Sequence, residues 1–180
     1  MQGQQGGGSC FDGDGMVAVG ENGTETERTD RLRAGSRVYS PTLQREVTVV
    51  ATTFSYELEL YSVNGLLITS KHPIKMDLAS DWVLPGDVAE QRQPARPTMV
   101  YNFVVSEGAT MLVNNVTVLT LGEDFHGSDR LWSPSARDFF ATSKVIDALR
   151  LMPSWPDCNL TRINVDAAYR TMLGWPRRDL

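Results

Sequence analysis

The sequence predicts a mainly β protein followed by a mixed C-terminal segment that contains one or two helices. From residue 16 to about residue 121, short runs rich in Val, Thr, Ile and Tyr are broken by turn residues every ten or so positions, as in all-β proteins. After Gly122 the apolar residues change to helical spacing. With 180 residues, of which 41% are hydrophobic, the chain is long enough for one main domain but not for two.

The all-β part is expected to contain eight strands, over residues 16–19, 37–40, 46–53, 57–63, 66–69, 100–105, 110–113 and 116–121. Asn64-Gly65 and Asn114-Asn115 each separate two apolar runs, and these residues tolerate the positive φ of a two-residue hairpin. The strands that flank them should therefore pair. Residues 90–98 are rich in Pro, Arg and Gln, which predicts an exposed loop.

The C-terminal part is expected to hold an amphipathic helix over residues 139–152. Phe140, Val145, Ile146, Leu149 and Met152 recur at helical intervals there, and Pro153 ends the run. A shorter helix is expected over residues 165–173, before Gly174.

Two segments about fifty residues apart have a similar shape. Leu-Arg-Ala-Gly-Ser at 32–36 leads into a strand, and Val-Leu-Pro-Gly-Asp at 83–87 has the same pattern. A duplicated β unit would explain the similarity, and so would two unrelated turns that both use Gly.

The domain organisation follows from composition. The Gly- and Ser-rich residues before Cys10 are typical of a flexible linker, so we expect residues 1–9 to join an upstream segment to a domain over 10–121. Residues 122–180 would then be an extension packed on that domain. Residues 1–9 lack the apolar core of a secretory signal or membrane segment, and the longest apolar runs are strand-sized, so no membrane span is expected.

Charge and cysteine content limit the classes of partner. Lys and Arg number 17 against 22 Asp and Glu, a net charge of -5 that does not favour binding to nucleic acid. Two cysteines are too few for a disulfide scaffold; they are compatible with a reducing cytoplasm but do not require it. We find no metal-ligand spacing and expect no cofactor.

Cys10 is the first candidate for chemistry, because it stands where the linker meets the first structured segment. Its thiol can attack the carbonyl carbon of Ser9 through a five-membered transition state, an N-to-S acyl shift that converts the amide into a thioester. The Ser9-Cys10 peptide would be the scissile bond. An ordinary buried or free cysteine is the alternative.

Three further residues could assist this shift. His72 is suited to protonate the departing amide nitrogen, and Thr69, three positions earlier, could hydrogen-bond to the same peptide. Asn102 is a polar residue within a strand-like run and could orient the thiol or the tetrahedral intermediate. The alternatives are a structural histidine and a solvent-facing strand position.

These residues, in this order, resemble the conserved blocks of the Hint superfamily, the self-cleaving module shared by inteins and hedgehog proteins. The similarity covers roughly residues 9–121 and rests on Cys-Phe-x-Gly at 10–13, Thr69-x-x-His72, and Val-Tyr-Asn-Phe at 100–103 leading into the run at 111–118. The continuation through Phe-Phe-Ala-Thr at 139–142 and residues 145–155 is similar to Vint domains, which typically follow a von Willebrand factor A domain. That domain is therefore an expected upstream partner in cis.

The resemblance implies a horseshoe-like, pseudo-twofold all-β body in which Cys10 and Thr69-His72 meet at the centre. It assigns Cys10 as the nucleophile, His72 as the proton donor and Thr69 as its helper. Many inteins have Asp where this chain has Asn102, and an amide cannot take a proton in the same way.

The chain also departs from inteins at the closing hairpin. Inteins end there with His-Asn, whereas this chain has Leu119-Thr120, and neither side chain can perform Asn cyclisation. We therefore expect N-terminal cleavage without C-terminal cleavage or full splicing, with water, a thiol or another small nucleophile resolving the thioester. A Hint-fold linker or interaction module that does not cleave, and transfer of the upstream segment to a lipid or amine, remain as alternatives.

Overall fold

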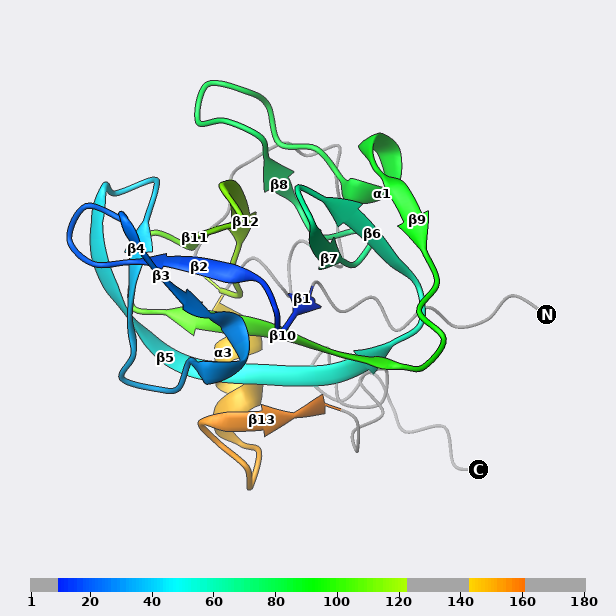
Figure 1. Ribbon diagram of the computed structural model, residues 1–180. Helices are drawn as coiled ribbons and strands as arrows, with labels where there is room; N and C mark the ends of the chain where they lie inside the picture. Colours follow the sequence, from blue (N-terminus) through cyan, green and yellow to red (C-terminus); the bar gives the residue numbers. More distant parts are fainter. Residues whose placement is uncertain (1–9, 123–142, 161–180) are drawn as a thin grey trace, which may run out of the picture.

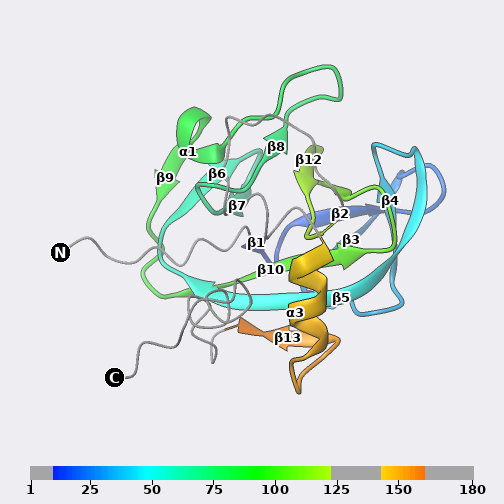
Figure 2. The ribbon, with the colours of Figure 1, turned by 180° about the vertical axis from the view of Figure 1, so that it is seen from behind.

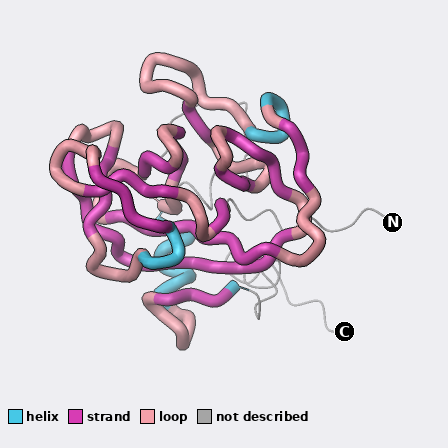
Figure 3. Tube along the Cα trace, viewed as in Figure 1, coloured by secondary structure: helices cyan, strands magenta, loops and turns pink. Residues whose placement is uncertain are grey.

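The computed structural model describes residues 10–122 and 143–160, and strands dominate them (Figure 3). This confirms the prediction of a mainly β protein. Within the described part of the chain, none of the helices is long and apolar enough to cross a membrane.

The strands form two sheets. The larger sheet has the order β13-β5-β10-β1-β7-β6-β9, with β4 also paired to β5, and the smaller has the order β3-β2-β11-β12-β8. The bounds are β1 Phe11–Asp12, β2 Met16–Val19, β3 Glu25–Arg28, β4 Arg37–Ser40, β5 Arg45–Glu57, β6 Leu60–Val63, β7 Leu66–Ile68, β8 Ile74–Lys75, β9 Glu90–Arg92, β10 Thr98–Val105, β11 Thr110–Val113, β12 Val116–Leu119 and β13 Asp157–Asn159.

The two longest strands, β5 and β10, form the base of the molecule (Figure 1). They pair antiparallel from Thr98 opposite Glu57 to Val105 opposite Val49. Figure 1 shows β2, β3, β4, β11 and β12 rising on one side of this base and β6, β7 and β9 on the other, with β1 between them. The body is therefore horseshoe-shaped, and β1 lies at its centre.

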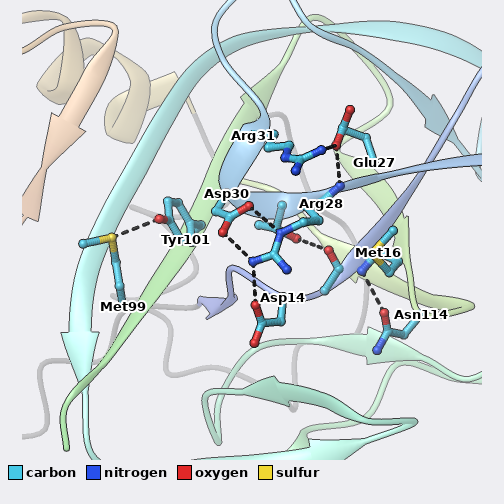
Figure 4. A network of polar contacts seen from close by, with 11 residues as sticks. Asp14, Met16, Glu27, Arg28, Asp30, Arg31, Met99, Tyr101 and Asn114 are labelled. Carbon is cyan, nitrogen blue, oxygen red and sulfur yellow. Dashed lines mark hydrogen bonds and ion pairs between the residues drawn. The ribbon is translucent and has the colours of Figure 1, made fainter.

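The two predicted hairpin turns are confirmed, and they bind each other. Asn64 and Gly65 join β6 to β7, Asn114 and Asn115 join β11 to β12, and all four residues have positive φ. Asn114 Nδ2 donates to Asn64 O at 3.1 Å, and Asn114 Oδ1 accepts from Met16 N at 2.8 Å (Figure 4). These bonds connect turns from the two sides of the horseshoe.

The C-terminal segment covers one face of β5 and β10. Figure 2 shows helix α3 (Ser143–Arg150) crossing these strands, and β13 pairs parallel with β5. Val145 and Leu149 of α3 pack with Ala51, Val104 and Cys158 in a cluster of buried residues. Removing this apolar surface from water holds the helix to the sheet.

The described helix is shorter than the one predicted over residues 139–152. It covers 143–150, while 139–142 lie outside the described residues, as does the helix expected over 165–173. Residues 151 and 152 form turns, with Met152 N bonded to Leu149 O at 3.1 Å.

Several strand predictions need correction. The strand expected at 57–63 begins at Leu60, because β5 continues through Glu57. The loop expected at 90–98 contains the exposed strand β9, paired to β6, and the first residue of β10. The strands β1, β3, β8, β9 and β13 escaped prediction because they are short, and β3 and β9 are mostly polar, so they carry no apolar alternation.

The similar segments at 32–36 and 83–87 have different backbones. Gly35 has a φ of 92°, after the short 3-10 helix η1 (Thr29–Arg31), whereas Gly86 lies inside helix α1 (Pro85–Val88). Each segment nevertheless precedes a strand that pairs at one end of the larger sheet, β4 on β5 and β9 on β6.

The bonds between the two turns can be tested with a matched pair of glycine variants. Both Asn114→Gly and Asn115→Gly allow positive φ, but only the first removes the bonds to Met16 and Asn64. We expect Asn114→Gly to lower the free energy of unfolding by about 1–3 kcal/mol and the exposed Asn115→Gly to change it little, measured by urea denaturation. Equal losses in the two variants would contradict a role for these bonds.

Candidate active site

Cys10 is held by its backbone at the start of β1. Its side chain is 2% exposed, and the adjacent Phe11 pairs with Tyr101 of β10 on one side and with Ile68 of β7 on the other. The strand β1 is thus fixed between β10 and β7, at the centre of the horseshoe. Ser9, on the other side of the candidate scissile bond, lies outside the described residues.

Thr69 binds both backbone polar groups of Cys10. The Cys10 N–H donates to Thr69 Oγ1 at 3.0 Å, Thr69 N–H donates to Cys10 O at 2.9 Å, and the Thr69 hydroxyl donates to the same carbonyl at 3.2 Å. The Cys10 nitrogen is the amide nitrogen of the Ser9-Cys10 peptide. The structure therefore brings the predicted Thr69 into direct contact with the atom that would leave in an acyl shift.

His72 is buried beside β1 in its neutral form. Its ring stands edge-on to Phe11, with the ring centroids 5.7 Å apart. Nε2 is 2.7 Å from the carbonyl oxygen of Leu119, which can only accept, so Nε2 carries the proton and Nδ1 carries a lone pair. Burial lowers the pKa of His72 to about 4, and the bond to Leu119 only partly opposes this shift.

The free nitrogen of His72 lies in the same buried region. Nδ1 has no hydrogen-bond partner among the described residues. Because the Thr69-x-x-His72 turn closes with His72 N bonded to Thr69 O at 3.3 Å, both side chains are carried by one turn next to Cys10 and Phe11. A buried nitrogen with an unused lone pair can accept a proton and pass it on.

The Cys10 thiol lies among apolar side chains. It packs with Leu60, Val100 and Leu67, and burial raises its pKa to about 12, assisted by the negative charge of Glu57 and opposed by a hydrogen bond from Ser55. The thiol is therefore protonated at neutral pH and must lose its proton in order to attack.

Asn102 lies in the strand next to Cys10. Continuing the pairing of Phe11 with Tyr101 by one residue places Asn102 opposite Cys10. Asn102 is 1% exposed, its Oδ1 accepts from Phe103 N at 2.8 Å, and its carbonyl accepts from the Thr53 hydroxyl at 3.2 Å. The alternative of a solvent-facing strand position is therefore wrong.

Leu119 and Thr120 lie close to the same site through the backbone. The Leu119 carbonyl sets the tautomer of His72, a role that sequence reasoning missed because any residue has a carbonyl. The Thr120 side chain is buried, and its hydroxyl has no partner in the part of the chain that the structure describes. Leu119 and Thr120 are thus both buried, and Leu119 is the one that contacts His72.

Sequence reasoning also missed Asp12, a buried carboxylate two residues after Cys10. It is 7% exposed, and its Oδ1 has no partner within residues 10–122 and 143–160. Burial and the charge of Asp14 raise its pKa to about 6, against a hydrogen bond from the backbone of Leu67. The only sequence signal was its position two residues after Cys10.

The turn after β1 is fixed by an exposed ion-pair cluster, shown in Figure 4. Arg28 of β3 binds Asp14 at 2.6 Å and both carboxylate oxygens of Asp30, at 3.0 and 2.8 Å. The guanidinium holds the pKa of Asp30 below its usual range. Because the guanidinium joins Asp14 to Asp30, this cluster ties the turn after β1 to η1.

Cys158 lies apart from this chemistry. It is fully buried in the cluster under α3, its thiol donates to Leu149 O at 3.7 Å, and neither it nor Cys10 is in a disulfide. No group of three His, Cys, Asp or Glu that could hold a metal ion occurs in the described ranges.

Comparison with known proteins identifies relatives of this arrangement. A family model described as Vint, Hint-domain, matches residues 9–171. No curated protein matches the chain. Among solved structures, the chain is similar to a bacterial intein-like domain from Clostridium thermocellum, with 22% identity, a TM-score of 0.52, and coverage of 62% of this chain and 98% of that one.

A second solved structure is a DnaB intein from Synechocystis, with 12% identity, a TM-score of 0.42, and coverage of 63% of this chain and 99% of that one.

The buried Asp12 should make stability depend on pH. The pKa of Asp12 is about 6 in the folded protein, against an ordinary value of 3.8. The free energy of unfolding therefore falls as the pH rises from 3.8 to 6, and it stays lower above pH 6. Asp12→Asn keeps an acceptor for Leu67 but cannot ionise. Relative to wild type, we expect it to gain on the order of 2 kcal/mol of unfolding free energy between about pH 4 and about pH 8.

Urea denaturation at the two pH values measures this gain, and Asp14→Asn serves as the control. The Asp14 side chain is 78% exposed, so its loss should shift the unfolding free energy by less than about 1 kcal/mol at both pH values. If the difference in unfolding free energy between Asp12→Asn and wild type does not depend on pH, burial does not disfavour the ionised form of Asp12.

Proposed function

The chain belongs to the Vint family of Hint domains, and on that premise we propose that it is a self-processing domain that cleaves the Ser9-Cys10 peptide by an N-to-S acyl shift. The observation that carries the proposal is the contact of Thr69 with both the amide nitrogen and the carbonyl of Cys10. A hydroxyl that contacts the peptide nitrogen, and a neutral imidazole carried by the same turn, are groups suited to activate an amide.

In the proposed shift, the Cys10 sulfur forms a bond to the carbonyl carbon of Ser9 while the bond from that carbon to the Cys10 nitrogen breaks. The thiol loses one proton and the departing nitrogen gains one, so the reaction neither consumes nor releases a proton overall. The product is a thioester on Cys10 with a free α-amine. Thr69 would hold the nitrogen in place as the bond breaks.

His72 would supply the proton to the nitrogen. It rests neutral, so Nδ1 must first take up a proton before it can give one. Once protonated, an imidazolium whose pKa is about 4 is a strong acid and transfers its proton readily to a departing amine. Burial of His72 therefore makes its protonated ring give up the proton readily, instead of keeping it as a permanent charge.

Resolution of the thioester would release the upstream segment. Water, a thiol or another small nucleophile attacks the thioester carbonyl. The bond from that carbon to sulfur breaks, and the Cys10 thiol remains on the domain. Leu119 and Thr120 have no side-chain amide for cyclisation, so C-terminal cleavage and full splicing are not proposed.

A second candidate function is a Hint fold that no longer cleaves and serves as a linker or interaction module. Two observations favour it: the thiol has a pKa of about 12, and the residue opposite Cys10 is an amide instead of a carboxylate. Transfer of the upstream segment to a lipid or amine differs from hydrolysis only in the attacking group.

The proposal is tested on the full chain with a folded reporter joined before Met1. We expect dithiothreitol to accelerate loss of the reporter at Ser9-Cys10, because a thiol resolves thioesters faster than water does. Cys10→Ala should abolish the loss, and His72→Ala should slow it by at least about 100-fold. Mass spectrometry of the released piece locates the cut and identifies the attacking nucleophile.

Cys158→Ala is the matched control, because it removes the other buried thiol without touching the site. Loss of the reporter that persists in Cys10→Ala would contradict the acyl shift. An intact fusion in a folded wild type would favour the linker function.

A further inference from the structure

The residues that face the Cys10 thiol come from β5 as well as from β7 and β10. Side chains alternate along β5, so Thr53, Ser55 and Glu57 project from one face of the sheet. Ser55 lies opposite Val100 in the β5-β10 pairing, and Val100 packs directly against Cys10. The register therefore places Ser55 and Glu57 on the side of the sheet where the thiol lies.

Two interactions join this strand to the sulfur. The hydroxyl of Ser55 hydrogen-bonds to the Cys10 side chain, and the carboxylate of Glu57 acts on it through its charge. Glu57 is half-buried, so its carboxylate is shielded in part from solvent while still able to exchange a proton with it. Ser55 thus contacts the sulfur, and Glu57 lies two residues further along the same face of β5, near enough for its charge to act on the thiol.

The thiol needs a base, and neither Asn102 nor His72 supplies one well. Asn102, opposite Cys10, has an amide that cannot take a proton. His72 has a pKa of about 4, whereas burial and the charge of Glu59 raise the pKa of Glu57 above the usual range of a glutamate. Glu57 is therefore a stronger base than His72, and its carboxylate becomes neutral when it accepts a proton.

We propose that Glu57 is the base that takes the proton of Cys10, and that Ser55 stabilises the resulting thiolate by a hydrogen bond. The S–H bond breaks, its electron pair stays on sulfur, and an O–H bond forms on the Glu57 carboxyl. The net charge of the pair is unchanged, because one anion replaces another. Glu57 then returns its proton to solvent, and His72 delivers a proton from solvent to the departing nitrogen. The inference rests on the proposed function.

The experiment compares two carboxylates on the same stretch of chain. In the reporter fusion, hydroxylamine traps the thioester, so that the rate of trapping follows the acyl shift. Glu57→Gln should slow trapping by at least about 100-fold, and the exposed Glu59→Gln should change it by less than about threefold. Glu57→Asp, which keeps a shorter carboxylate, should retain more activity than Glu57→Gln.

The pH profile separates a base from a structural residue. The charge of Glu59 acts on Glu57, and the charge of Glu57 acts on the Cys10 thiol; Asp12 and His72 are the other buried groups near β1 with shifted pKa values. The wild-type rate should rise with pH as Glu57 ionises, in a limb above the usual pKa range of a glutamate, and then level off. Glu57→Gln should lose this limb, whereas Asp12→Asn should keep it.

Ser55→Ala supplies the second variant. Losing a hydrogen bond to a charged sulfur should slow trapping by about tenfold and leave the pH limb in place. Circular dichroism and urea denaturation of each variant show that it is folded.

The outcomes distinguish this inference from the proposed function. A folded Glu57→Gln that traps at the wild-type rate, or that keeps the pH limb, overturns the role of Glu57 while the acyl shift stands. Trapping that is absent from wild type, or unchanged in Cys10→Ala, overturns the proposed function itself.

Discussion

The structure depends on the pairing of one very short strand with two others. Because β1 contains only Phe11 and Asp12, it has few hydrogen bonds of its own, and it is held by β10 on one side and β7 on the other. Thr69 extends this pairing by three bonds to the backbone of Cys10. These bonds fix the backbone of Cys10 in the centre of the molecule.

The same central position sets the protonation state of every group near the nucleophile. Burial keeps Cys10 and His72 neutral and raises the pKa of Asp12, since a low-dielectric interior disfavours charge. An acyl shift moves a proton from sulfur to nitrogen, and neither the Cys10 thiol nor the His72 ring carries a charge at neutral pH that would oppose that transfer. The cost is a thiol that needs a base, which is the need that Glu57 and Ser55 meet in our proposal.

The C-terminal segment contributes to the same sheet from its other end. The register places Cys158 beside Thr53, which in turn lies opposite Asn102, so a row of side chains runs from β13 toward Cys10. The helix α3 covers the Cys158 end of this row and leaves the Cys10 end to Leu60 and Leu67. The segment after the closing hairpin therefore buries part of the strand that carries the candidate base.

Local chemistry determined much of the fold from the sequence alone. Asn64-Gly65 and Asn114-Asn115 close hairpins because few other residues accept positive φ, and apolar runs mark β2, β4, β10, β11 and β12 because each has a buried face. The order of Cys10, Thr69, His72 and Asn102 was visible in the same way. Short polar strands such as β3 and β9 carry no such signal.

Only the tertiary structure decided which groups meet. The Leu119 carbonyl that orients His72 and the Ser55 and Glu57 side chains beside Cys10 are far from their partners in the chain, and none belongs to a sequence pattern. Their contacts follow from the register of β5 on β10 and from the path of β12. A sequence specifies residue types, but pKa values and proton positions depend on burial and on neighbours across strands, which exist only once the sheets have formed.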